Sequence, residues 1–112
     1  MDALPPLVAE HLGEIRALCE KYHVRKLTIF GSAVKGTFDP EKSDLDFVVD
    51  FDEDPDDVHY PWGGRPMALL RDLKVVFGRN VDVVDRSAIE NPYFLQVLAL
   101  TERPLYERTR AA

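Results

Sequence analysis

The chain has 112 residues, of which 46% are hydrophobic and 30% are charged, an ordinary balance for one globular domain. Its 14 Lys and Arg against 20 Asp and Glu give a net charge of −6, which argues against general nucleic-acid binding through phosphate neutralisation. No apolar run approaches the roughly 20 residues of a membrane span, no signal peptide is recognisable, and the one cysteine excludes an internal disulfide. We expect a single domain over residues 1–112 in the cytoplasm, without membrane contact.

The first predicted elements are a helix and two strands. Pro5-Pro6 suits a helix start, and apolar side chains then recur with helical spacing, which predicts one amphipathic helix over residues 5–22. After a short turn, residues 26–30 (KLTIF) have the composition of a strand that ends at Gly31. Residues 44–51 (DLDFVVDF) form the second predicted strand.

The second half of the chain predicts a loop, two helices and two strands. Residues 52–66 are acidic and turn-rich and indicate a long surface loop. Pro66 opens a helix that Gly78 ends, and residues 80–85 (NVDVVD) follow as a strand. Ser87 and Glu90 have capping-box spacing and predict the start of a last helical region, with Pro92 at a break or restart within it. Its predicted apolar face is Phe94, Leu95, Val97, Leu98 and Leu100.

Residues 104–107 (PLYE) complete the pattern as a short closing strand. The resulting order, α-β-β-α-β-α-β, indicates an α/β (α+β) fold with a small mixed sheet flanked by helices.

Two carboxylates stand two positions apart on the second predicted strand. Asp44 and Asp46 therefore share one face, where two negative charges repel and raise each other's pKa unless a cation lies between them. Oxygen ligands of this kind suit Mg²⁺. The alternative is that one aspartate faces solvent while the other caps a turn.

A possible anion-binding turn precedes them. Gly31 and Ser32 directly follow a strand, so that backbone N–H groups and a hydroxyl could face a phosphate. Lys35 and Gly36 complete a G-S-x-x-K-G pattern. A plain tight turn and a solvated surface lysine are the alternatives.

A third carboxylate, Asp82, interrupts the valines of the third predicted strand. Val81 and Val83 point to one face, so Asp82 points to the other and could join Asp44 and Asp46 if the two strands are neighbours. An edge strand with Asp82 in water is the alternative. Asp50 and Asp85 lie at strand ends, where turn and cap roles are ordinary, and are poorer candidates.

Taken together, Gly31-Ser32 and Ser43-Asp44-Leu45-Asp46 resemble the nucleotidyltransferase superfamily that includes DNA polymerase beta. The short chain is similar to its minimal nucleotidyltransferases (MNT domains), which are typically antitoxins encoded beside HEPN-domain toxins. The resemblance implies a polymerase beta-like core. It also implies that Asp44, Asp46 and Asp82 bind two Mg²⁺ ions. The nucleotide-binding residues that it implies are Gly31, Ser32, Lys35, Gly36 and Ser43.

The implied reaction is transfer of AMP from ATP to a tyrosine hydroxyl of a partner HEPN toxin, with Asp82 as the base, in a hetero-oligomer. One departure is visible, since relatives usually carry Arg at the position of Lys35, and Lys lacks the bidentate geometry of Arg toward phosphate. The alternative function is a weakly active or inactive module that neutralises its toxin by stoichiometric contact. The acidic residues 52–57 and the aromatic residues Tyr60 and Trp62 would suit that contact, or would simply belong to a surface loop. A polymerase role ranks third, because the chain shows no basic stripe.

Overall fold

The structure is a computed structural model that describes residues 4–31, 39, 44–52 and 64–108. Its first half contains α1 (Pro6–Ala9), α2 (Leu12–Lys21), β1 (Val24–Phe30) and β2 (Leu45–Phe51). Its second half contains α4 (Gly64–Phe77), β3 (Val81–Asp85), the 3₁₀ turn η2 (Arg86–Ala88), α5 (Pro92–Thr101) and β4 (Arg103–Glu107). None of the helices in this part of the chain has the length and hydropathy needed to cross a bilayer.

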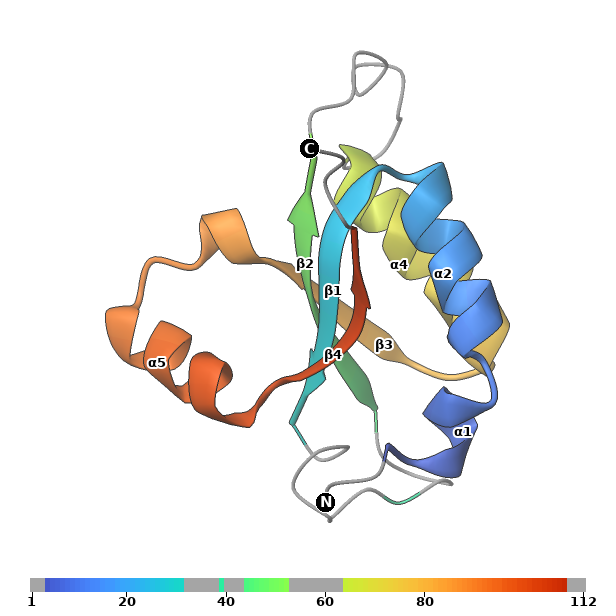
Figure 1. Ribbon diagram of the computed structural model, residues 1–112, viewed down its shortest axis with the longest axis horizontal. Helices are drawn as coiled ribbons and strands as arrows, with labels where there is room; N and C mark the ends of the chain where they lie inside the picture. Colours follow the sequence, from blue (N-terminus) through green and yellow to red (C-terminus); the bar gives the residue numbers. More distant parts are fainter. Residues whose placement is uncertain (1–3, 32–38, 40–43, 53–63, 109–112) are drawn as a thin grey trace.

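The four strands form one mixed sheet in the order β3-β2-β1-β4 (Figure 1). β1 pairs antiparallel with both β2 and β4, whereas β2 and β3 run parallel and are joined through α4. The predicted mixed α/β architecture is therefore confirmed, including the closing strand.

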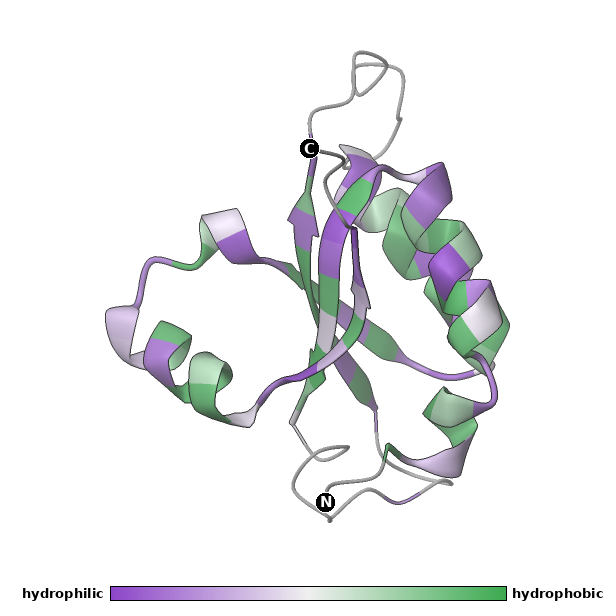
Figure 2. Cartoon of the chain, viewed as in Figure 1, coloured by the Kyte–Doolittle hydropathy of each residue, from purple (hydrophilic) through white to green (hydrophobic). Residues whose placement is uncertain are grey.

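Helices α2 and α4 cover one face of the sheet (Figure 1), and the hydrophobic core lies between them and the strands. Green residues on both helices and on the central strands in Figure 2 mark this layer. The fully buried core side chains include Ile15 and Cys19 of α2, Leu69 and Leu73 of α4, and Leu27, Ile29, Leu45, Phe47 and Val49 of the strands. Because strand side chains alternate between faces, this assigns Asp46, Val48 and Asp50 of β2 to the opposite face.

The opposite face is the one toward which α5 lies (Figure 1). Thr28 and Val48 are buried there, although neither belongs to the core cluster on the helical side. Leu98 of α5 is also buried, with 1% of its surface exposed. We call this side of the sheet the α5 face.

Three predicted details are wrong. The helix over residues 5–22 is broken at Glu10 and His11, where the imidazole packs edge-on against Phe77 with ring centroids 5.3 Å apart and the backbone leaves helical geometry. Gly13, a poor helix former, lies just beyond the break. Two short helices therefore replace one.

The other two wrong details concern the last helix. Ser87 and Glu90 do not start it, because Ser87 lies inside η2, where its backbone N–H donates to Asp85 Oδ1. Asn91 is the N-cap of α5, and Pro92 is its first residue, so the predicted break or restart at Pro92 is confirmed. Leu100, placed on the apolar face, is 82% exposed, because only one side of α5 meets the sheet.

Candidate active site

β1 ends at a glycine that lies against a carboxylate of β2. Gly31 has φ +75°, a conformation that side-chain-bearing residues rarely adopt. A Cβ added at Gly31 would collide with Asp46 Oδ2 and would stand 3.3 Å from Asp46 Cγ. Glycine is therefore required here for two reasons, the backbone conformation and the close approach of the Asp46 carboxylate.

Asp46 and Asp82 lie side by side on the α5 face. They are direct partners in the parallel register of β2 and β3, and each follows a core-facing residue, Leu45 or Val81. The predicted neighbourhood of these two carboxylates is therefore confirmed in position, although β3 is also an edge strand, as the alternative had it. Asp82 is exposed, whereas Asp46 is only partly exposed.

The carboxylates perturb one another. Burial raises the pKa of Asp46 above its ordinary value, and the negative charges of Asp82 and Asp44 raise it further, as does a hydrogen bond between the Asp46 and Asp82 side chains. Asp44 immediately precedes β2 and is exposed. Two negative charges thus act on one half-buried carboxyl group.

The donor set fits a hard cation, although the three side chains do not converge on one point. Within residues 4–31, 39, 44–52 and 64–108, no three His, Cys, Asp or Glu side chains form a group that could hold a metal ion as they stand. A divalent cation would relieve the repulsion that helps to raise the pKa of Asp46. Oxygen-only ligands of this kind are those that Mg²⁺ prefers in proteins.

Four predicted site residues lie outside the described part of the chain: Ser32, Lys35, Gly36 and Ser43. Their roles stay predictions. Most of the acidic segment 52–57, together with Tyr60 and Trp62, also lies outside it.

The two aspartates judged poorer candidates have other partners. Asp85 caps η2, accepting hydrogen bonds from the backbone N–H and the hydroxyl of Ser87 at 3.0 and 2.7 Å. Asp50 Oδ2 accepts from Arg86 Nε at 3.0 Å, and Arg86 Nη2 also donates to Glu102. We call Asp50, Arg86 and Glu102 the Arg86 cluster.

Sequence reasoning missed the Arg86 cluster. Burial alone would raise the pKa of Glu102, but the hydrogen bonds and charge of Arg86 outweigh it and lower that pKa. The cluster ties the end of α5 to β2 on the same face as Asp46. Alternation along β2, which places Asp50 on the face of Asp46, was the available signal.

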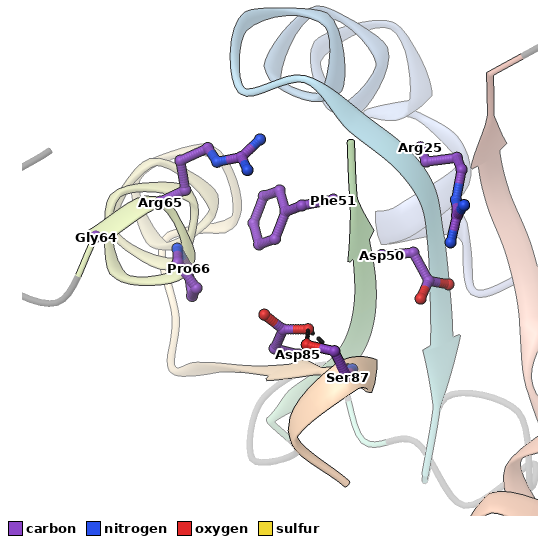
Figure 3. A pocket seen from close by; sticks show the side chains of 8 residues that line it. All are labelled: Arg25, Asp50, Phe51, Gly64, Arg65, Pro66, Asp85 and Ser87. Carbon is purple, nitrogen blue, oxygen red and sulfur yellow. Dashed lines mark hydrogen bonds between the residues drawn. The ribbon is translucent and has the colours of Figure 1, made fainter. Parts of the chain in front are cut away.

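A pocket of about 450 Å³ opens at the far end of β2, away from Asp46 (Figure 3). Its lining includes Arg65, Phe51, Asp50 and Asp85. These polar groups have partners within the protein, since Arg65 Nη1 donates to the Tyr22 carbonyl at 3.0 Å and its guanidinium lies 4.6 Å from the Phe51 ring centroid. The geometry therefore favours the Asp46 end of the sheet as the reactive site.

Comparison with known proteins gives matches in both sequence and structure. The family model of the nucleotidyltransferase domain matches residues 15–106. The protein adenylyltransferase MntA of Thermococcus cleftensis is 30% identical over 91 residues, which cover 81% of this chain and 82% of that protein. MJ1379 of Methanocaldococcus jannaschii, provisionally named a protein adenylyltransferase, is 35% identical over 78 residues, covering 70% and 73% of the two chains.

Solved structures share the fold. A chain from a toxin–antitoxin complex with AMP-PNP superposes with a TM-score of 0.63 at 20% identity, covering 87% of this chain and 73% of that one. A chain from the complex of a tri-AMPylated Shewanella oneidensis HEPN toxin with its MNT antitoxin gives 0.61 at 16% identity, covering 90% and 73%. With the family model matching most of its length and the carboxylate pair beside Gly31, this chain belongs to the nucleotidyltransferase domain family.

Proposed function

We propose that this chain is an antitoxin that transfers AMP from ATP to a tyrosine hydroxyl of a HEPN-domain toxin. The observation that carries the proposal is the position of Asp46, between its register partner Asp82 and the glycine turn at Gly31. The names of the similar proteins support the reaction and the partner class, since they describe protein adenylyltransferases and HEPN–MNT complexes.

In the proposed reaction the acceptor oxygen attacks the α-phosphorus of ATP. The new bond joins that oxygen to the α-phosphorus, the bond to the β-phosphate oxygen breaks, and pyrophosphate leaves. The acceptor proton passes to Asp82, which is the more exposed carboxylate of the pair and is therefore open to an approaching hydroxyl.

The other residues of the site hold the nucleotide. Asp44, Asp46 and Asp82 would bind two Mg²⁺ ions, which supply charge neutralisation at the triphosphate and a lowered pKa at the acceptor hydroxyl. The absence of a side chain at Gly31 leaves room for the Asp46 carboxylate against the backbone of the turn. Ser32, Lys35, Gly36 and Ser43 are proposed to contact the triphosphate.

The experiment uses the toxin partner and intact-mass spectrometry. A HEPN toxin encoded beside this protein is incubated with a tenfold-lower amount of it, with ATP and Mg²⁺. We expect a mass gain of one or more AMP units on most toxin molecules, mapping to tyrosine, and none with EDTA. Asp46→Asn is the inactive variant, and Asp85→Asn is its matched control, because Asp85 is a cap outside the carboxylate pair.

Stoichiometric neutralisation is the competing function, and the same samples decide it. A catalyst protects an excess of toxin, whereas a binder stops near molar equivalence. Toxin that stays unmodified yet is neutralised at equal concentration, with or without ATP, would reject the transferase proposal.

A further inference from the structure

An aromatic pair lies on the other side of Asp46 from Asp82. Phe30 is the register partner of Asp46 in the antiparallel pairing of β1 and β2, so the two side chains share the α5 face. A row therefore crosses the sheet on that face from Asp82 through Asp46 to Phe30. Phe94 of α5 meets Phe30 edge-on, with ring centroids 6.0 Å apart and an angle of 71° between the rings.

The packing of the core does not account for these two rings. Phe30 and Phe94 keep part of their surface exposed, and neither belongs to the core cluster nor packs against it. In an edge-on pair the partner ring covers a face of only one of the two rings. Phe30 and Phe94 instead lie beside Gly31 and the carboxylate pair of Asp46 and Asp82, which are outside the core.

The position of Phe94 is fixed by its surroundings. Asn91 Oδ1 accepts hydrogen bonds from the backbone N–H groups of Tyr93 and Phe94, at 2.9 and 3.4 Å. Leu98, one turn further along α5, is buried, and Arg86 holds Glu102 just beyond the helix. Phe94 is thus presented by an anchored helix rather than by a free loop.

We propose that Phe30 and Phe94 form the contact surface for the adenine ring of ATP. This inference rests on the proposed function, in which the triphosphate lies at the turn beginning with Gly31. Phe30 immediately precedes that turn, whereas Asp82, proposed to receive the acceptor proton, lies on the opposite side of Asp46. The nucleotide side of the site is therefore the side of the aromatic pair.

Stacking on an aromatic ring depends on the size and planarity of the base more than on its hydrogen-bonding groups. Aromatic side chains stack on every base, since each base has a π face. The surface should accordingly favour purine over pyrimidine nucleotides and distinguish ATP from GTP only weakly. Specificity for adenine alone would require donors and acceptors that two phenylalanines do not possess.

The test compares ATP with inorganic tripolyphosphate, which carries the phosphates but no base. Affinities are measured by calorimetry with Mg²⁺ for the wild-type chain and for Phe94→Leu. We expect the affinity for ATP to fall by about fivefold or more, the lower range for loss of base–aromatic stacking, and that for tripolyphosphate to stay unchanged. Tyr93→Leu is the matched control, because its ring is 71% exposed, and it should change neither affinity.

A second variant, Phe30→Leu, guards against a folding artefact in α5, and thermal melting verifies that both variants fold. Equal weakening of ATP and tripolyphosphate binding, or unchanged ATP binding, would overturn the inference. So would a wild-type chain that binds ATP no more tightly than tripolyphosphate. A higher KM for the toxin with unaltered ATP affinity would assign the rings to the acceptor instead. Because binding needs no acceptor, the result holds even if AMP transfer is not observed.

Discussion

Asp46 and Asp82 are neighbours across the parallel pairing of β2 and β3, and the pKa of the half-buried Asp46 is raised by burial first and then by the charge of Asp82. Holding two carboxylates together has a free-energy cost in the folded chain that the unfolded chain does not bear. In the proposed function the same repulsion provides a cation site. Stability and activity should therefore respond in opposite directions when one charge is removed.

Asp46→Asn should stabilise the metal-free chain at neutral pH by roughly 0.2–1 kcal/mol while lowering AMP transfer by roughly 100-fold or more. Because the folded-state pKa of Asp46 is raised, the ionised Asp46 carboxylate destabilises the folded chain, and this effect is fully present above that pKa. It disappears below the unfolded value of about 3.9, where both states are protonated. Urea unfolding at several pH values should show the variant's advantage shrinking on acidification. An advantage that grows toward low pH would contradict this account.

Asp82 and Asp85 offer a paired test, because they lie three positions apart on one strand. Asp82→Asn should reduce AMP transfer about 10²–10⁴-fold, as expected for loss of a general base, and should slightly stabilise the metal-free chain, because it removes a charge that repels Asp46. Asp85→Ala removes the side chain that caps η2 and should lower stability by about 1 kcal/mol with transfer retained. Steady-state assays and melting curves separate the two effects. Activity that depends on Asp85 but not on Asp82 would show that the wrong face of β3 has been assigned.

Gly31→Ala should destabilise the fold by roughly 1–3 kcal/mol, from the positive φ and from the collision with the Asp46 carboxylate. Transfer should fall as well, because Asp46 must move. Gly13→Ala is the matched control: its added Cβ meets nothing within 4 Å, and its helical position predicts a gain of roughly 0.5–1 kcal/mol. Chemical denaturation gives the free energy of unfolding of both variants. Equal stability of Gly31→Ala and Gly13→Ala would refute the special requirement for glycine at position 31.

Arg86→Ala should cost roughly 1–3 kcal/mol, because two largely buried carboxylates, Asp50 and Glu102, lose their partner. The pKa of Glu102 is lowered in the folded chain, so its contribution is present above the unfolded value of about 4.3 and is lost as pH falls through the folded one. The difference in the free energy of unfolding between the wild type and Arg86→Ala should consequently become smaller at acidic pH. A difference that does not depend on pH would indicate that Arg86 acts through packing alone.

Sequence patterns correctly predicted those strands and helix ends that depend only on neighbouring residues. Alternation along residues 44–51 and 80–85 correctly predicted two strands, and Gly78, with φ +62°, ends α4 as expected. The same alternation predicted that Asp82 could meet Asp46, on the condition that their strands are neighbours. Whether the two strands are neighbours depends on the tertiary structure, in which β2 and β3 pair in parallel.

Contacts between distant segments could not be predicted in the same way. His11 has helical spacing, yet its ring turns to Phe77, 66 positions later (77 − 11), and the helix breaks there. Phe30 and Phe94 are 64 positions apart (94 − 30), and nothing local indicates their contact. Leu100 satisfies the apolar period of α5, but a helix that meets the sheet along one side leaves such a residue in water.

The pairing of β1 with β4 has a consequence for how the domain forms. Lys26 and Glu107, partners across that pair, are 81 positions apart (107 − 26), so the contact is strongly non-local and closes late. During synthesis one edge of β1 therefore stays unpaired until residues 103–107, which form β4, have left the ribosome. An exposed edge of this kind is a template for pairing with another chain. The interval between translation of β1 and of β4 is thus the period in which the nascent protein is most open to misassembly.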